Sequence, residues 1–299
     1  MGQLNSVKAN YAESYLLVAV LACFLGGVDP FGGAGRLSGL ILSFVILQLV
    51  STGVNLLRMD PYFVQAMWGF IIILLVAVNF LQMGFMFTLI GVILFVAAGR
   101  LDWWEAWVFL VVYFLIAAAS NVWMLYYDRA LLQERTQAAS KPDSKSWDSV
   151  MVTANLLLTA ALFAVIGVDA GRYGWSDVPG WLRLLAGAGV LASFAITLWA
   201  ARINTFMSAR VRIQAERGHH AITTGPYARV RHPMYASMCL LDLSLPLLLG
   251  SWWGLVISGL MIAAAVIRTV LEDNTLQREL PGYLEYTRQV RWRLLPGVW

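Results

Sequence analysis

Long runs of hydrophobic residues divide this sequence, and each run is close to the length that crosses a bilayer. A transmembrane helix needs about 20 consecutive apolar residues, because only a helix or a closed barrel satisfies the backbone hydrogen bonds in hydrocarbon. Barrel strands would show short segments of alternating polarity instead. We therefore predict an all-α polytopic membrane protein with eight or nine transmembrane helices. The runs cover residues 14–29, 38–57, 62–80, 83–99, 103–126, 149–168, 179–203, 234–250 and 252–271.

Two of the boundaries between these runs are short. Only residues 81–84 separate the third run from the fourth, so residues 62–99 form either two helices or one long kinked helix. Gly250-Ser251 separates the last two runs, which predicts a tight hairpin with Trp252-Trp253 at the membrane interface.

Glycines inside the runs indicate close helix packing. Gly187 and Gly189 match the letters of a dinucleotide-binding motif, but that motif requires a preceding strand and a helix start, and here it lies inside an apolar run. Gly35 and Gly39 are interpreted in the same way, because small residues let transmembrane helices approach each other closely.

The composition agrees with a membrane protein. Hydrophobic residues make up 60% of the chain and charged residues 13%, about half the share in soluble domains. These values exclude a soluble globular or disordered chain. Two cysteines cannot build a disulfide framework, and both lie in apolar runs where a buried thiol is inert.

The basic residues predict the orientation. They gather in residues 127–148, in residues 202–231 and in the C-terminal tail, and these segments lie an even number of runs apart. The positive-inside rule places all three in the cytoplasm. The net charge of +4 reflects this bias and an attraction to anionic lipid headgroups; we expect no nucleic-acid partner. Residues 1–100 are almost purely apolar helices of unknown role, whereas residues 101–299 hold the polar chemistry.

A dense polar segment precedes the eighth run. Gly225-Pro226 predicts a turn, and His232-Pro233 predicts a helix start with proline at its first position. The free N–H groups of a helix start favour an anion, so we expect a pocket for a polar cofactor here. The alternative is a simple anchor of Tyr and Arg side chains at the level of the headgroups.

Three further features concern possible chemistry. Arg268 and Glu272 lie four residues apart on one face at the end of the last run, where they would serve an anion and a cation held side by side; the plain alternative is a surface ion pair. Asp242 lies inside an apolar run and is either functional or a packed polar contact. The three histidines have no carboxylate at metal-ligand spacing, so we expect no metal.

At these residues the sequence resembles the isoprenylcysteine carboxyl methyltransferase family, especially its short bacterial members. The shared signature is Gly-x-x-x-(hydrophobic)-Thr-x-Gly-x-Tyr-x-x-x-Arg-His-Pro-x-Tyr, which is residues 218–235 here. An acidic pair, two tyrosines and a Val-to-Pro segment follow. The resemblance is close from about residue 200 onward. The later parts of the signature are Glu272-Asp273 with Leu276, Tyr283, Tyr286 and Val290 to Pro296.

The resemblance implies S-adenosylmethionine as cofactor, bound by about residues 205–299, with a cytoplasmic site in the bacterial inner membrane. The family's substrate-side arginine falls on Arg268, and we expect Arg268 and Glu272 to be the catalytic residues. Asp273 replaces the usual second Glu, and His220-Ala221 replaces a Thr-Leu pair of eukaryotic members. The implied cofactor-binding residues are Gln214, His219, His220, Ala221, Ile222, Tyr227, His232, Pro233, Met234, Tyr235 and Glu272.

The implied reaction is methyl transfer to a lipophilic small molecule or lipidated acceptor, such as a prenylcysteine-like carboxylate. A carboxylate is ionised at neutral pH, so the protein need only align the reactants and exclude water. Glu272 would hold the charged part of the cofactor, and Arg268 would pair with the acceptor. Three alternatives stay open: an NADPH-dependent steroid or enone reductase, a phospholipid-amine methyltransferase, and a non-catalytic membrane scaffold or carrier.

Overall fold

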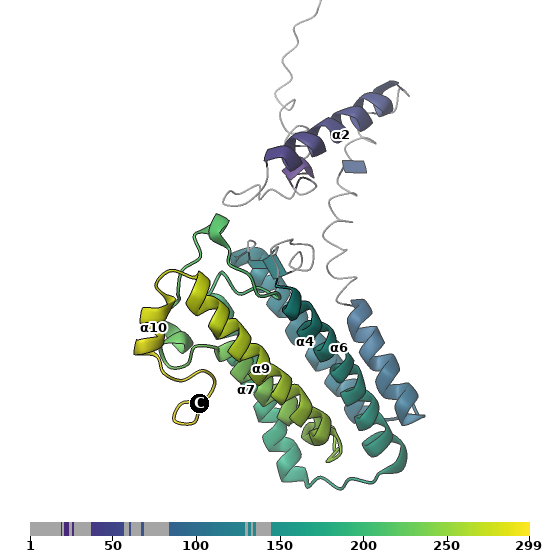
Figure 1. Ribbon diagram of the computed structural model, residues 1–299. Coiled ribbons are helices and arrows are strands. Elements are labelled where there is room, and N and C mark those ends of the chain that lie inside the picture. Colours follow the sequence, from purple (N-terminus) through teal and green to yellow (C-terminus); the bar gives the residue numbers. More distant parts are fainter. Residues whose placement is uncertain are drawn as a thin grey trace, which may run out of the picture. The chain divides into compact units, whose positions relative to one another are not determined.

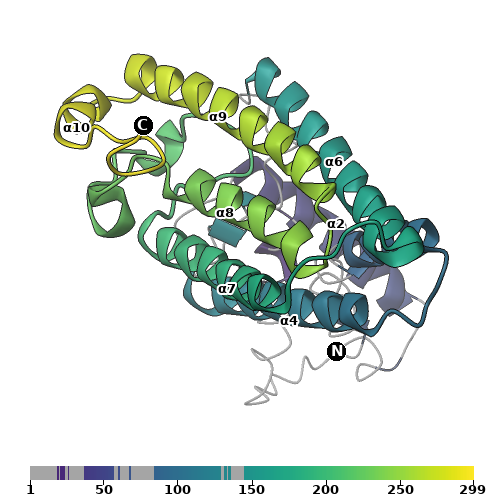
Figure 2. The same ribbon diagram turned by 90° about the horizontal axis from the view of Figure 1, so that it is seen from below.

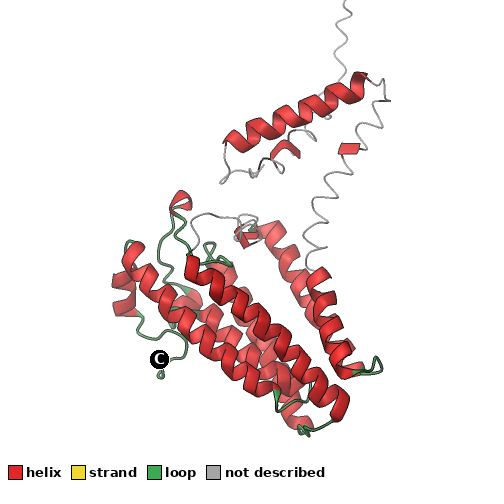
Figure 3. Cartoon of the chain, turned by 45° about the vertical axis from the view of Figure 1, so that its right-hand side comes forward, coloured by secondary structure: helices red, strands yellow, loops and turns green. Residues whose placement is uncertain are grey.

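The structure is a computed structural model that describes residues 37–56, 84–128 and 145–299, with a few shorter stretches between residues 19 and 135. These residues form helices joined by loops, and no strand occurs among them (Figure 3). The chain divides into two compact units, Met1–Met83 and Gly84–Trp299. The sequence placed the domain boundary at residue 100. The structural division lies earlier, so the helix Gly84–Ala98 belongs to the second unit.

The described helices confirm the predicted polytopic membrane protein. Four are long and apolar enough to cross a membrane, and three shorter apolar helices accompany them. Most of the predicted runs 14–29 and 62–80 lies outside the described residues, and so does the choice between one and two helices for residues 62–99. The long helices are α4 (Trp104–Tyr127), α6 (Ser146–Ile166) with its π-helical extension η2 (Gly167–Tyr173), α7 (Gly180–Ile203) and α9 (Gly254–Glu279). The shorter ones are α2 (Leu37–Leu56), Gly84–Ala98 and α8 (Pro233–Leu248).

In the first unit, α2 packs through small and apolar residues. Leu47 lies in a buried cluster with Leu21 and Trp68. A Cβ atom on Gly39 would lie only 2.3 Å from the carbonyl oxygen of Gly26, so this glycine permits the close approach that the sequence predicted. Gly35 lies outside the described residues.

The second unit is a bundle in which α8 lies between α7 and α9, and α6 packs beside α9 (Figures 1 and 2). Its core joins side chains of several helices, including Leu94, Phe109, Ile166 and Met261. A Cβ atom on Gly189 would lie 2.3 Å from Ser244 Oγ, so the glycine pair in α7 serves helix packing, as predicted.

The bundle has two distinct ends. At one end, here named the hairpin end, α8 turns into α9 through Gly250, whose φ of +85° favours glycine. Ser251 is fully buried, and its hydroxyl donates to Asp169 Oδ2 at 2.5 Å. The predicted tight hairpin is confirmed, and Trp252 and Trp253 beside it are 41% and 58% exposed. The other end, where α7 ends and α8 begins, is named the pocket end.

Candidate functional site

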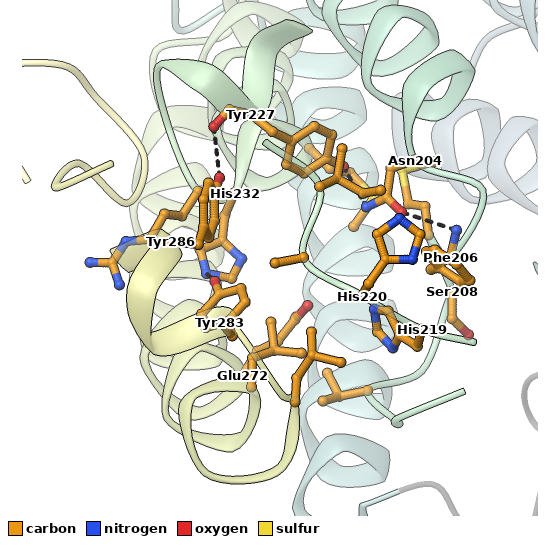
Figure 4. A pocket seen from close by; sticks show the side chains of 18 of the residues that line it. Asn204, Phe206, Ser208, His219, His220, Tyr227, His232, Glu272, Tyr283 and Tyr286 are labelled. Atoms are coloured by element: carbon orange, nitrogen blue, oxygen red, sulfur yellow. Dashed lines mark hydrogen bonds between the residues drawn. The ribbon is translucent and has the colours of Figure 1, made fainter. Parts of the chain in front are cut away.

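A pocket lies at the pocket end of the second unit. Its walls come from the loop after α7, the 3-10 turn Gly225–Ala228, the start of α8, the end of α9 and the short helix α10 (Tyr283–Gln289) (Figure 4). All predicted cofactor residues except Gln214 lie in these walls. The lining includes His219, His220, Ala221, Ile222, Tyr227, His232, Pro233, Met234, Tyr235 and Glu272.

The start of α8 has the form that the His232-Pro233 pair predicted. Pro233 is the first residue of the helix, and His232 precedes it with φ −127° and ψ 65°. The C-terminal segment fixes this start, because the N–H of His232 donates to the carbonyl of Arg293 at 2.9 Å, and the N–H of Arg231 donates to the carbonyl of Trp292 at 2.9 Å. The chain end thus positions two residues that line the pocket, Arg231 and His232.

Behind this wall, the fully buried carboxylate of Asp273 is a charge hub. It accepts two hydrogen bonds from Arg231 Nη1, at 2.8 and 2.9 Å, and one from Arg293 Nε at 3.0 Å. The hydroxyl of Tyr283 donates to it at 3.1 Å, and His232 Nε2 lies 3.3 Å away. Asp273 does not line the pocket itself; it holds residues that do.

Glu272, the neighbouring acid, faces the pocket (Figure 4). The hydroxyl of Tyr235 donates to its Oε2 at 2.5 Å. Arg268 does not form the surface ion pair with Glu272 that was the plain alternative: its Nε donates to Asp148 Oδ1 at 2.8 Å, and its Nη2 donates to the carbonyl of Ala209 at 3.0 Å. Arg268 lies over the ring of Tyr235 at 5.5 Å and is not among the residues that line this pocket.

The opposite wall is aromatic. Phe206 stacks on His219 with 4.7 Å between ring centroids, and His220 meets Phe206 edge-on. Burial, and next to it the nearby charge of His220, lowers the pKa of His219 to about 4. The N–H of Gln214 donates to His219 Nδ1 at 3.3 Å, which leaves the ring proton on Nε2. His219 is therefore neutral at physiological pH.

Gln214 supports this wall from behind. Its side chain is fully buried, its Nε2 donates to the carbonyl of Phe206 at 2.7 Å, and its Oε1 accepts from Arg217. It positions Phe206 and His219, and it does not reach the pocket.

Two tyrosines tie the turn Gly225–Ala228 to its surroundings. Asn204 Nδ2 donates to the Tyr227 hydroxyl at 3.0 Å, and the Tyr286 hydroxyl donates to the Tyr227 carbonyl at 2.7 Å. Burial raises the pKa of Tyr227 to about 12 and also raises the pKa of Tyr286. Both hydroxyls therefore stay protonated; the Tyr286 hydroxyl acts as a donor, and the Tyr227 hydroxyl accepts from Asn204.

Several residues of the site were missed in the sequence. Asn204 and Phe206 follow the end of α7 without a motif, and Asp148 is 120 residues from its partner Arg268. The one signal in the sequence that could have pointed to Asp148 is its position as an acid in the first turn of an apolar helix. Asp242 is buried but does not line the pocket; its backbone carbonyl accepts from Ser258 at 2.5 Å.

The donor set suits a nucleoside that carries an amino acid. Aromatic faces on one wall would receive a flat base or a sulfonium cation, and Glu272 would receive an ammonium group. The cavity between the walls measures about 90 Å³, whereas small-molecule pockets usually enclose about 300–1,000 Å³. The pocket walls would therefore have to move apart to admit such a ligand.

Residues 182–281 match the family model of phospholipid methyltransferase. The match covers α7, α8, α9 and the loop between α7 and α8, and so includes most of the pocket. It supports a membrane methyltransferase, a class of enzyme for which S-adenosylmethionine is the expected methyl donor.

Short similarities to sugar permeases also occur. The chain is 35% identical over 81 residues to the galactose/methyl galactoside import permease protein MglC of Haemophilus influenzae. The aligned segment covers 27% of this chain and 24% of the permease. It is 31% identical over 77 residues to the ribose import permease protein RbsC of Bacillus subtilis, 26% of this chain and 24% of that protein. The chain thus spans about a quarter of the length of these relatives.

Proposed function

We propose that this chain is an integral membrane methyltransferase that uses S-adenosylmethionine and acts on a lipophilic acceptor. The observation that carries the proposal is the coincidence of two independent features. The segment that matches the phospholipid methyltransferase family also contains Tyr227, His232, Tyr235 and Glu272, which line one pocket. The basic loops favour a cytoplasmic location for this pocket.

In this proposal the cofactor, when bound, supplies an electrophilic methyl group on a sulfonium centre. Glu272 would hold the ammonium group, and the Tyr235 hydroxyl would fix the carboxylate of Glu272 in place. Phe206 and His219 would stack on the base. Because His219 is neutral, it would add no positive charge beside the sulfonium cation.

We further propose an acceptor with an anionic group next to its lipid part, as in a prenylcysteine-like carboxylate. Arg268 donates to Asp148 through Nε and to the Ala209 carbonyl through Nη2. Its Nη1 would donate to the acceptor anion. Glu272 is the only acid among the described lining residues. A carboxylate acceptor leaves Glu272 free for the cofactor, because no proton has to be removed.

The family match favours a second candidate, the amine of a phospholipid. Arg268 would then pair with the lipid phosphate rather than with the reacting group. The ammonium must lose a proton before it attacks, and Glu272 would have to accept it. The permease similarities cover too little of either chain for a proposal of sugar transport.

The acceptor classes differ in the stability of their products. Membranes containing the chain would be incubated with S-adenosylmethionine labelled in its methyl group, and the lipid extract would then be treated with alkali. A methyl ester releases volatile labelled methanol, whereas an N-methyl amine keeps its label. Glu272→Gln should abolish incorporation, and Glu285→Gln, which removes an exposed acid on α10, should leave it unchanged. No incorporation above control membranes, or equal incorporation by Glu272→Gln, would refute the proposal.

A further inference from the structure

Arginine and glutamate side chains line the pocket at the pocket end, and some of these charges are already neutralised. The Arg212 side chain is only 2% exposed, and it donates to the carboxylates of Glu134 and Glu216. Arg231, which also lines the pocket, is paired with the buried Asp273. These two arginines therefore have their counter-ions within the chain and are not available to a charged ligand.

Arg210 also lines the pocket, but it has no such partner. It is half-buried in the loop after α7, and its Nη1 donates to the hydroxyl of Ser149 at 2.7 Å. Among the residues that the structure describes, no carboxylate lies within 4 Å of its guanidinium, and its Nε and Nη2 have no hydrogen-bond partner. Adjacent donors of this kind bind a carboxylate in bidentate fashion.

Two carboxylates contact the chain on either side of Arg210, and other arginines engage both of them. Asp148 accepts from Arg268 Nε at 2.8 Å. Glu134 accepts from Arg212 Nε at 2.8 Å. Because these acids already serve other guanidinium groups, Arg210 needs an anion from outside the described part of the chain to be neutralised.

Glu272 is the opposite charge in the same pocket, across from the loop that carries Arg210 (Figure 4). It accepts from the Tyr235 hydroxyl, and no cationic group of the described residues lies within 4 Å of it. Arg268, one helical turn before Glu272, donates to the carbonyl of Ala209, which precedes Arg210. The cavity between the walls measures about 90 Å³, so one small ligand can reach both charges.

We propose that Arg210 binds the carboxylate of the cofactor's amino-acid part while Glu272 binds its ammonium group. The inference rests on the proposed function and adds a binding residue to it. An α-amino acid carries one charge of each sign on the same carbon, and the pocket offers one unpaired charge of each sign. A cofactor whose charges are all phosphates would meet Glu272 as a like charge. Arg268 then stays available to the anion of the acceptor.

Isothermal titration calorimetry of the detergent-purified chain tests this role with two ligands, S-adenosylhomocysteine and its decarboxylated analogue, in which hydrogen replaces the carboxylate. A hydrogen bond to a charged group is worth roughly tenfold in affinity or more. The native chain should therefore prefer S-adenosylhomocysteine by about tenfold. Arg210→Gln should bind the two ligands equally, through a loss of affinity for S-adenosylhomocysteine alone, and Arg210→Lys should recover part of the preference.

Arg202→Gln is the matched control, because it removes an exposed arginine at the end of α7 that does not line the pocket; it should keep the native preference. Unchanged binding of the decarboxylated analogue shows that Arg210→Gln is folded. An Arg210→Gln variant that keeps the preference, or that loses both ligands equally, would overturn the inference.

A third result would also overturn it: unchanged affinity for S-adenosylhomocysteine together with a raised KM for the acceptor would assign Arg210 to the acceptor. The proposed function fails separately, because a native chain that binds neither ligand would refute it and the role of Arg210 together.

Discussion

Replacing Asp273 by Asn removes the negative charge that holds the back wall of the pocket. Asp273 is fully buried, and the Arg231 side chain that it pairs with is only 7% exposed. The substitution keeps the volume and one carbonyl oxygen, but it places an amide N–H₂ where two arginines donate. Arg231 then remains as a buried charge without its counter-ion.

The magnitude follows from the two ion pairs. Breaking a buried pair by removing one partner costs about 3–5 kcal/mol, most of it from the charge left unpaired. The Arg293 side chain is 27% exposed, so its share is at most about 1 kcal/mol. A loss near 3–5 kcal/mol lowers the unfolding temperature of a unit of this size by roughly 10 °C. His232 and Tyr283 contact Oδ1 of the same carboxylate, so the loss of its charge weakens their hold on the pocket wall and cofactor affinity should fall as well.

Intrinsic tryptophan fluorescence during heating in detergent measures this effect. Glu285→Gln on α10 is the matched control, because it removes one exposed acid, and it should change the unfolding temperature by less than about 2 °C. The double variant Arg231→Gln/Asp273→Asn should recover part of the loss, since it removes the uncompensated charge. An Asp273→Asn variant as stable as the Glu285→Gln control would refute the role of Asp273 as a charge hub.

Three other predictions follow from the same structure. Gly189→Val should lower the unfolding temperature in the same assay, because its Cβ would lie 2.3 Å from Ser244 Oγ between α7 and α8; an unchanged temperature would contradict that close packing. The pKa of His219 is about 4 in the fold and about 6.5 when unfolded, so the free energy of unfolding should fall as pH drops from 6.5 to 4 and be flat with respect to His219 above 6.5. His219→Phe should flatten that slope in pH-dependent thermal scans, and an unchanged slope would show that other groups cause it. Arg268→Ala should retain S-adenosylhomocysteine binding and lose turnover, whereas Asp148→Asn should chiefly raise the KM for the acceptor by leaving Arg268 unfixed; equal loss of cofactor binding in both would refute the separation of roles.

The sequence predicted the helices well because hydropathy depends on composition within one segment. The predicted runs 103–126, 179–203 and 234–250 differ from α4, α7 and α8 by at most a few residues. The hairpin at Gly250 and the start of α8 at Pro233 were also predictable, because glycine and proline constrain the backbone locally.

The polar partners were not predictable, because they depend on which helix ends meet in space. The spacing of Arg268 and Glu272 placed both side chains on one helix face, but it did not reveal that Arg268 pairs with Asp148 and that Glu272 accepts from Tyr235. A partner from another helix offered better geometry than the neighbour one turn away. The same applies to Gln214, which the family resemblance placed at the cofactor and the structure places behind Phe206.

The most direct test of the central claim is a thermal-shift titration of the detergent-purified chain with S-adenosylhomocysteine and, separately, with NADPH. A ligand that binds only the native state stabilises it by about 2.7 kcal/mol at a hundred times its Kd. The account predicts that S-adenosylhomocysteine raises the unfolding temperature, that Glu272→Gln removes this rise and that NADPH has no effect. A rise with NADPH alone would indicate a reductase, and no rise with either ligand would contradict a nucleotide-cofactor pocket altogether.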